Sequence, residues 1–262
     1  MLMKKGNKTL INEFAVLEDY FFGGISFQKY TIENESAVYI TDIERSYFRL
    51  FLQRHQHANP KTDIENLQEL FAKHQIENWV YVLPERFHTP ILQNTLLEMG
   101  FNFEEQSTAM IYEIAENQSL LGQNTLVIEN VNADNSAWLN ILQEAFGGND
   151  KTSEQYGNAL LSAAVKGVDM HHFIGLENNN PVVAITLTFL EDSVRIDNVA
   201  CHPNYQRLGY ASQMMQFALK LVLSKAIKHV FFEASSKGLG IYKRIGFKEL
   251  FTNYTYSKGI VF

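Results

Sequence analysis

The sequence of 262 residues has a single cysteine, Cys201, and it contains neither a long apolar run nor a long run of lysine and arginine. One cysteine excludes an intrachain disulfide and a zinc site built from several cysteines, so we expect a reducing compartment, by default the cytoplasm. The longest strongly apolar run, Pro181 to Leu190, is ten residues long, well below the ~20 that a helix needs to cross a bilayer. The N-terminal segment carries Glu13 and Glu18 where a signal peptide requires apolar residues. We therefore expect no membrane partner.

Charge is divided unevenly along the chain. Residues 1 to 125 hold 10 Lys+Arg and 17 Asp+Glu, whereas residues 126 to 262 hold 12 of each, so the whole net charge of -7 lies in the first half. Binding of duplex nucleic acid requires a basic face that neutralises phosphates. We therefore expect no nucleic-acid partner. The acidic first half either steers a cationic ligand toward the protein or serves solubility, and the sequence leaves both readings open.

The segment after residue 125 shows alternating strand and helix patterns. One helix that starts near Gly209 has a clear apolar stripe at Ala211, Met214, Met215, Ala218, Leu219 and Val222. This order predicts an α/β domain with a mixed sheet. The expected elements are a strand at 126–129, helices from Asn132 or Asp134 to Phe146 and from Ser153 to Val165, strands His171–Glu177, Val182–Leu190 and Ser193–Cys201, the helix from Gly209, a strand His229–Ala234, a short helix Lys237–Arg244, and strand pieces Phe247–Phe251 and Tyr254–Ser257.

The first half gives weaker signals. A capping box at Thr62–Glu65 predicts the start of a helix, and we expect a strand at Trp79–Leu83, a helix at Thr89–Met99 and a strand within Phe103–Ile114. The segment Leu97–Phe101 resembles Lys243–Phe247, since both end in Gly-Phe before a strand, which suggests an internal repeat. The polar segment 116–124 is the expected linker. We predict two domains, at residues 1–118 and 125–262.

The most informative motif is the turn that leads from the strand ending at Cys201 into the helix that starts near Gly209. The first backbone amides of a helix have no intrahelical acceptor, and the helix dipole adds positive charge there. Gly209 and the small Ala211 allow an anion to approach the main chain, and Arg207 adds a mobile cation. The alternative interpretation is an ordinary helix start with a glycine turn. The second motif, Tyr242-Lys-Arg-Ile-Gly246-Phe247, favours the anion site because it follows at a suitable distance.

Together these two motifs resemble the signatures of the GNAT acyltransferase superfamily, Gln/Arg-x-x-Gly-x-Gly/Ala and Tyr-x-x-x-Gly-Phe. The resemblance covers about residues 125 to 258, and it implies a GNAT acyl-CoA N-acyltransferase fold with acetyl-CoA as co-substrate. It implies that main-chain groups of Val199 and Cys201 contact the pantetheine arm, and that Tyr242 donates a proton to the departing thiolate. The cofactor-binding residues that it implies are Val199, Cys201, Gln206, Arg207, Leu208, Gly209, Tyr210, Ala211, Ser212 and Ser235.

An amine acceptor must lose a proton before it attacks a thioester, so a general base is expected. Asp197 occupies the strand position where several family members carry a glutamate, Glu233 is the second candidate and His202 a weaker third. For Asp197, a solvated strand edge or a structural hydrogen bond is an equally good explanation. Ser235 stands where the family often has an asparagine. A shorter hydroxyl therefore replaces an amide group that can donate and accept hydrogen bonds at the same time.

We expect no metal site. His171 and His172 are adjacent in a strand and face opposite ways, so they cannot chelate together. His55 and His57 have no third ligand in view, and we expect them to be solvated.

The function expected from the resemblance is an N-acetyltransferase that transfers an acetyl group directly to an amine, with Tyr242, Asp197 and Glu233 as catalytic residues. The alternative is a non-catalytic acyl-CoA-binding regulatory module whose acidic first half binds a partner. A third possibility, transfer from aminoacyl-tRNA, is disfavoured because a basic face is missing. For the first half we predict a degenerate GNAT-like lobe without a phosphate loop. Its counterpart of the loop, aligned at Asp42–Tyr47, has two carboxylates and no glycine.

Overall fold

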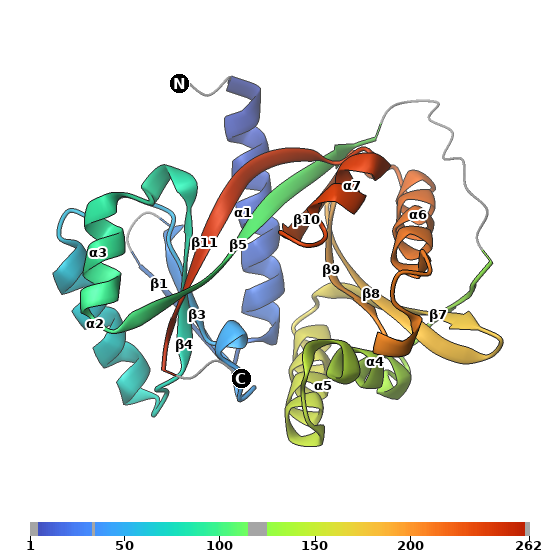
Figure 1. Cartoon of the computed structure of the whole chain (residues 1–262), viewed down its shortest axis with the longest axis horizontal. Coiled ribbons are helices and arrows are strands. Elements are labelled where there is room, and N and C mark those ends of the chain that lie inside the picture. Colours follow the sequence, from blue (N-terminus) through green and yellow to red (C-terminus); the bar gives the residue numbers. More distant parts are fainter. Residues whose placement is uncertain (1–4, 33–34, 115–124, 260–262) are drawn as a thin grey trace.

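The computed structural model describes residues 5–32, 35–114 and 125–259. Its described part forms one 11-stranded mixed sheet with helices on both faces (Figure 1). The helices are α1 (Lys5–Ile25), α2 (Pro60–Lys73), α3 (Pro90–Glu98), α4 (Ser136–Phe146), α5 (Asp150–Val165), α6 (Tyr210–Leu223) and α7 (Leu239–Ile245). The strands are β1 (Gln28–Thr31), β2 (Ala37–Ile40), β3 (Leu50–Leu52), β4 (Trp79–Pro84), β5 (Phe101–Glu113), β6 (Val127–Asn130), β7 (Asp169–Glu177), β8 (Asn180–Leu190), β9 (Ser193–Cys201), β10 (His229–Ser235) and β11 (Lys248–Lys258).

The two halves of the chain exchange their last strands. The strand order is β1-β2-β3-β4-β11-β5-β10-β9-β8-β7-β6, so β11 of the second half pairs with β4, and β5 of the first half pairs with β10. The two exchanged strands also pair with each other, antiparallel, from Lys248 opposite Ile111 to Lys258 opposite Phe101. The halves therefore share one hydrogen-bonded sheet.

The predicted internal repeat is confirmed. In each half a parallel strand pair, β3 with β4 or β9 with β10, is followed by a short helix and a long strand. Gly100 follows α3 with φ of 80°, and Gly246 follows α7 with φ of 116°. Both lie in the left-handed region, where glycine is the favoured residue for ending a helix.

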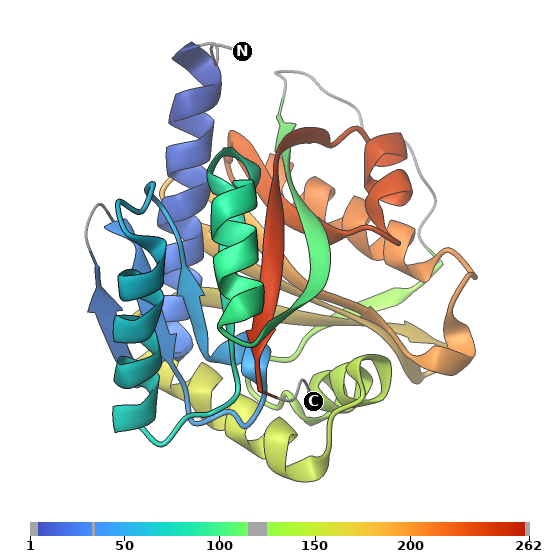
Figure 2. The ribbon, with the colours of Figure 1, turned by 60° about the vertical axis from the view of Figure 1, so that its left-hand side comes forward.

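The helices form two layers. α6 and α7 pack on one face of the second half, and their core includes Met214, Leu219 and Tyr242. α1, α4 and α5 share a cluster on the opposite face, where Phe21 of α1 lies with Trp138 of α4. Figure 2 shows α2 and α3 beside the first-half strands. Among the described residues, no helix has the length and apolar character that crossing a bilayer requires.

We did not predict α1 from the sequence, although its apolar residues recur at helical spacing. One face carries Ile11, Phe14, Leu17, Phe21 and Ile25, each at most 4% exposed. The Phe14 ring meets the edges of Phe231 and Phe251, with centroids 6.0 and 5.4 Å apart. Because Phe231 is in β10 and Phe251 in β11, α1 covers the sheet where the two halves join.

Several predicted boundaries were wrong. α2 begins at Pro60, so the predicted capping box at Thr62 lies inside the helix. Proline is favoured at the first position of a helix, and Pro60 occupies that position here. α4 begins after Asn135, although Asp134 accepts a hydrogen bond from the Ser136 amide. Further shifts are that α5 starts at Asp150, α7 covers Leu239–Ile245, and the last two strand pieces are the single strand β11. β5, β7 and β8 each begin two residues earlier than predicted, at Phe101, Asp169 and Asn180. The predicted linker 116–124 lies outside the described residues.

Candidate functional site

The turn between β9 and α6 presents an open helix start. Gly209 has φ of 85° and caps α6, and a side chain added there would meet nothing within 4 Å. Arg207 also has a positive φ, 64°. The first intrahelical bond is donated by Gln213, so the amides of residues 210 to 212 come before it. Leu208 is 59% exposed. An anion can therefore approach the amides of Tyr210 and Ser212, whereas the Ala211 amide donates a hydrogen bond to the Cys201 thiol.

Strands β9 and β10 separate next to this helix start. They pair in parallel from Ser193 opposite His229 to Ile196 opposite Phe232. Beyond this point β9 and β10 no longer pair with each other, although β9 stays paired with β8 as far as Cys201 and β10 with β5 as far as Ser235. Val199 and Cys201 lie in this separated part of β9.

Tyr242 lies beside the gap on the α7 face. It is 8% exposed, and its ring packs 4.3 Å from the ring of Phe232 and 6.3 Å from that of Phe247. Burial, together with the nearby Cys201, raises the pKa of Tyr242 to about 12. Burial also raises the pKa of the Cys201 thiol, although a hydrogen bond from the Ala211 amide opposes this shift. Tyr242 is therefore a protonated hydrogen-bond donor throughout the physiological pH range.

On the opposite side of the gap, Arg195 holds two predicted carboxylates together. Its Nε donates to both oxygens of Asp197 at 3.0 Å, and its Nη2 lies 3.7 Å from Glu233 Oε2. Its Nη1 lies 3.9 Å from Glu18 of α1, which also pairs with Arg54. Burial raises the pKa of Asp197, and Arg195 opposes that shift. The cluster therefore joins both halves of the chain.

The two carboxylates differ in what their oxygens can still accept. Ser107 and Asn253 both donate to Glu233 Oε1, at 2.6 and 2.8 Å. Glu233 Oε2 accepts no hydrogen bond from the described residues. Both oxygens of Asp197 instead face Arg195 Nε. Glu233 is therefore the carboxylate with an oxygen available for a ligand.

A cavity of about 280 Å³ adjoins this cluster on the α1 face. Residues of the second half form one end, and residues of β3 and β4 form the other. Its lining residues are Glu18, Phe22, Tyr47, Leu50, Leu52, Val80, Val82, Glu105, Ser107, Arg195, Asp197, Glu233, Ser235 and Thr255. The first half of the chain thus supplies one wall of a space that opens onto the gap between β9 and β10.

The sequence was compared with models of known protein families. Residues 144–262 match the family model described as an acetyltransferase (GNAT) domain. The matched residues include both the open start of α6 and Tyr242. GNAT proteins generally use acetyl-CoA as the acyl donor. Comparison with curated protein sequences gives no significant match.

Solved structures agree with the GNAT fold over most of the chain. A conserved protein of unknown function from Staphylococcus epidermidis has a TM-score of 0.68 at 14% identity, covering 88% of this chain and 93% of that one. A GCN5-related N-acetyltransferase from Kribbella flavida has a TM-score of 0.65 at 13% identity, covering 94% and 95%. A tandem GNAT protein from the clavulanic acid biosynthesis pathway has a TM-score of 0.55 at 12% identity, covering 87% and 79%. At these identities the likeness concerns the fold, and it fits two tandem GNAT lobes.

Within the described residues of the first lobe, the start of α2 is not an open helix start of this kind, and our alignment of its counterpart loop was wrong. Because β3 and β4 correspond to β9 and β10, the equivalent turn runs from Gln53 to Asn59, after β3, and not through Asp42–Tyr47. This turn contains no glycine, and α2 begins with Pro60, which has no amide hydrogen to donate. The corrected turn therefore also lacks the glycine and the free amide that a phosphate loop requires, and we still predict that this lobe does not bind CoA.

The histidines are placed differently from our expectation. His57 is buried, with Nδ1 2.9 Å from Asp63 and Nε2 2.8 Å from the Tyr81 hydroxyl, so it is not solvated as predicted. Burial lowers its pKa. His202 accepts a hydrogen bond from the Asn204 amide within its own turn, and it does not line the cavity described above. No group of three potential metal ligands occurs within residues 5–32, 35–114 and 125–259.

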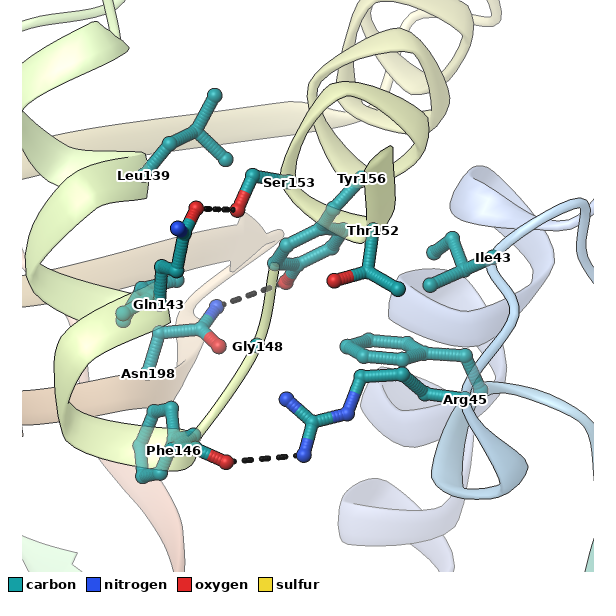
Figure 3. Close-up of a pocket in the computed structure, with 12 residues that line it drawn as sticks. Ile43, Arg45, Leu139, Gln143, Phe146, Gly148, Thr152, Ser153, Tyr156 and Asn198 are labelled. Carbon is teal, nitrogen blue, oxygen red and sulfur yellow. Dashed lines mark hydrogen bonds between the residues drawn. The ribbon is translucent and has the colours of Figure 1, made fainter. Parts of the chain in front are cut away.

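A second, smaller cavity lies where the α4–α5 turn of the second half meets the first half of the chain (Figure 3). It has about 50 Å³. Asn198, at φ of 56° in a bulge of β9, donates to the Tyr156 hydroxyl at 2.9 Å. Arg45 of the first lobe donates to the Phe146 carbonyl at 2.9 Å. These contacts fix the turn against the first lobe, next to the strand that carries Asp197.

Sequence reasoning missed the residues that link the two lobes. Arg195 is only 3% exposed, and a buried arginine in an apolar strand two residues before Asp197 is a signal that the sequence does contain. Glu18 is 2% exposed in α1, which we did not predict. The contribution of β3 and β4 to the cavity had no local signal, because it depends on the exchanged strands.

Proposed function

We propose that this protein transfers an acetyl group from acetyl-CoA to a primary amine, by direct transfer with both substrates bound. The observation that carries this proposal is the position of the gap between β9 and β10. On one side of it lie the open start of α6 and the Tyr242 side chain, and on the other lie Glu233 and the 280 Å³ cavity. Two substrates that enter from opposite faces of the sheet would meet there.

The residues present suit the pyrophosphate and the pantetheine of acyl-CoA. The amides before the first intrahelical bond of α6, the open space at Gly209 and the exposed Arg207 favour an anion. Val199, Cys201 and Ser235 line the separated parts of β9 and β10. When bound, acetyl-CoA would supply an acetyl group activated as a thioester.

Conversion of the substrate ammonium into an amide removes two protons from its nitrogen. Glu233 would accept the first, and the second would leave as the C–S bond breaks and would be taken up by the released thiolate, which becomes the free CoA thiol. Glu233 Oε2 would accept a proton from the substrate ammonium, because its one charged neighbour in the described residues, Arg195 Nη2 at 3.7 Å, is beyond hydrogen-bond distance. Asp197 keeps the Arg195 guanidinium in place. Tyr242 donates a hydrogen bond to the departing thiolate, because its pKa of about 12 exceeds the ~8.5 of an ordinary thiol and makes complete proton transfer unfavourable.

The test is release of free thiol from acetyl-CoA over a panel of polyamines, aminoglycosides, amino acids, peptides and alkylamines. We expect Tyr242→Phe to lower kcat by about 10- to 100-fold. The matched control is Tyr254→Phe, since Tyr254 stacks on His88 in the first lobe. Acetyl-CoA binding without thiol release from any amine, with no effect of Tyr242→Phe, would favour a non-catalytic acyl-CoA-binding module instead.

A second pair of variants separates the two carboxylates. We expect Glu233→Gln to lower kcat/KM by roughly 100-fold, which is the usual effect of losing a general base. Asp197→Asn should have a smaller effect on kcat, because Asp197 acts through Arg195. The reverse order would make Asp197 the base.

A further inference from the structure

The Glu233 carboxylate is held by two side chains from the exchanged strands β5 and β11. Ser107 Oγ donates to Glu233 Oε1 at 2.6 Å, and Asn253 Nδ2 donates to the same oxygen at 2.8 Å. A carboxylate oxygen offers two lone pairs to donors, so these two hydrogen bonds use both of those on Oε1. The direction of the carboxylate is therefore set by β5 and β11.

The register of the sheet explains why these two residues reach Glu233. On β5, Ala109 lies directly opposite Glu233. Ser107 lies two residues away from Ala109 and is paired with Asn253 of β11. Alternate residues of a strand share one face of the sheet, so Ser107 is on the same face as Ala109 and Glu233. Because the Ala109 side chain has no polar atom, the carboxylate turns along the strands to Ser107 and Asn253.

Asn253 is an unusual residue for its place in β11. Asparagine is depleted in strands and seldom buried, yet Asn253 is only 3% exposed within this 11-residue strand. A buried amide that lacks a hydrogen bond destabilises the fold. Donation from Nδ2 to Glu233 gives the amide a charged acceptor, which explains an asparagine at this position.

The two donors also decide how Glu233 stands toward Arg195. Arg195 Nη2 lies 3.7 Å from Glu233 Oε2, beyond hydrogen-bond distance. Without Ser107 and Asn253 the carboxylate is free to turn and form a close pair with this guanidinium, which can donate to both of its oxygens. Such a pair would leave neither oxygen for a substrate ammonium. Holding Oε1 therefore keeps Oε2 available.

We propose that Ser107 and Asn253 are positioning residues, which hold Glu233 so that Oε2 faces the acceptor ammonium and not Arg195. The proposal rests on the acyltransferase function and on the role of Glu233 proposed above. Ser107 belongs to β5, a strand of the first half that pairs with β10 of the second half. The first half thus contributes to the proton transfer as well as to the cavity wall.

The experiment measures kcat and KM of Ser107→Ala by thiol release from acetyl-CoA, with the best amine of the panel. We expect kcat to fall about tenfold, the usual effect of losing one hydrogen bond to a charged group, and the KM of acetyl-CoA to stay within about twofold. Ser107→Thr keeps the hydroxyl and should restore most of kcat. Asn253→Ala should lower kcat by a similar factor.

Thr108→Val is the matched control. It removes a hydroxyl from the next residue of β5, whose side chain lies on the opposite face of the sheet, and it should leave kcat nearly unchanged. Thermal unfolding and the affinity for acetyl-CoA, measured by titration calorimetry, show whether each variant folds. Ser107 is only partly buried, so its variants test the proposal even if Asn253→Ala is unstable.

A double-mutant cycle separates positioning from a general structural effect. In the Glu233→Gln background, Ser107→Ala should lower kcat by less than about twofold, because no base is left to position. A purely structural role predicts the same loss from Ser107→Ala in both backgrounds.

The outcomes distinguish this proposal from the proposed function. If Glu233→Gln impairs the reaction but Ser107→Ala leaves kcat unchanged, or lowers it equally in both backgrounds, the positioning role is overturned and the acyltransferase function stands. If Glu233→Gln has no effect while thiol is released, the positioning role is again overturned. No thiol release with any amine, despite acetyl-CoA binding, would overturn both.

Discussion

Replacing Arg195 by methionine tests the idea that one buried guanidinium joins the two lobes. The Arg195 side chain is 4% exposed and reaches Asp197, Glu18 and Glu233 at 3.0, 3.9 and 3.7 Å. Arg54 still pairs with Glu18 in the variant, so the main uncompensated groups are Asp197 and Glu233. Removing one partner of a buried ion pair costs about 3–5 kcal/mol. We expect a loss of that size in the free energy of unfolding at pH 8.

The loss should depend on pH in a definite direction. Burial already raises the pKa of Asp197, and Arg195 is the first group that opposes this. Without Arg195 the folded state binds a proton more tightly than the unfolded chain, so its stability relative to wild type recovers as the pH falls. For one group the slope is at most about 1.4 kcal/mol per pH unit. We therefore expect a smaller defect at pH 5.5 than at pH 8.

Urea denaturation followed by tryptophan fluorescence measures this directly. Trp79 is in the first half and Trp138 in the second, and both are at most 2% exposed. The second variant is Arg195→Met combined with Asp197→Asn, which removes one unpaired charge and should recover at least about 1 kcal/mol. A loss below about 1 kcal/mol for Arg195→Met, equal at both pH values, would refute the role of Arg195 in joining the lobes.

Three further predictions concern the helix start, a buried histidine and the exchanged strands. Gly209→Val should weaken acetyl-CoA binding at least tenfold, because the backbone φ of 85° strains a β-branched residue. Gly209→Asn should weaken binding less. Titration calorimetry that gives equal affinities for wild type and both variants would contradict this. Burial lowers the pKa of His172 to about 4, below the ~6.5 of the unfolded chain. The free energy of unfolding should therefore be highest above pH 6.5 and fall by about 2–3 kcal/mol as the pH drops toward 4.5. His172→Gln should flatten this part of the curve of unfolding free energy against pH, and an unchanged slope would show that another group titrates. A fragment of residues 1–118 should not fold alone, since β4 and β5 both lose a pairing strand; its circular dichroism should show an unfolded chain, and a cooperative thermal transition would show that the first lobe is independent.

The second half could be predicted from the sequence because its signals are local. The stripe from Met214 to Val222 determines which face of α6 is buried, and the glycines after α4 and α7 end those helices as expected. Gln206, Gly209 and Ala211 lie within one turn, so their spacing alone identifies the helix start. In these segments the interactions that determine the structure lie within a few residues of each other.

The first half and the cavity depend on contacts between distant residues. β11 lies between β4 and β5 although more than 130 residues separate it from them in the chain, and no local pattern records this exchange. The short strands β1, β2 and β3 are buried on both faces or lie near the edge, and their apolar runs are ambiguous without their neighbours. Arg195 and Glu18 are 177 positions apart, so their pairing could only be seen in the structure.

The central claim is that acyl-CoA and an amine meet at the gap between β9 and β10. The most direct measurement incubates the purified protein with acetyl-CoA and each member of the amine panel, and quantifies free CoA and the N-acetylated amine together by mass spectrometry. We predict that the two products form in equal amounts, and that their rate falls by about 10- to 100-fold in Tyr242→Phe and further in Glu233→Gln. Bound acetyl-CoA with no acetylated amine, or acetylation that is unaffected by both variants, would contradict the account.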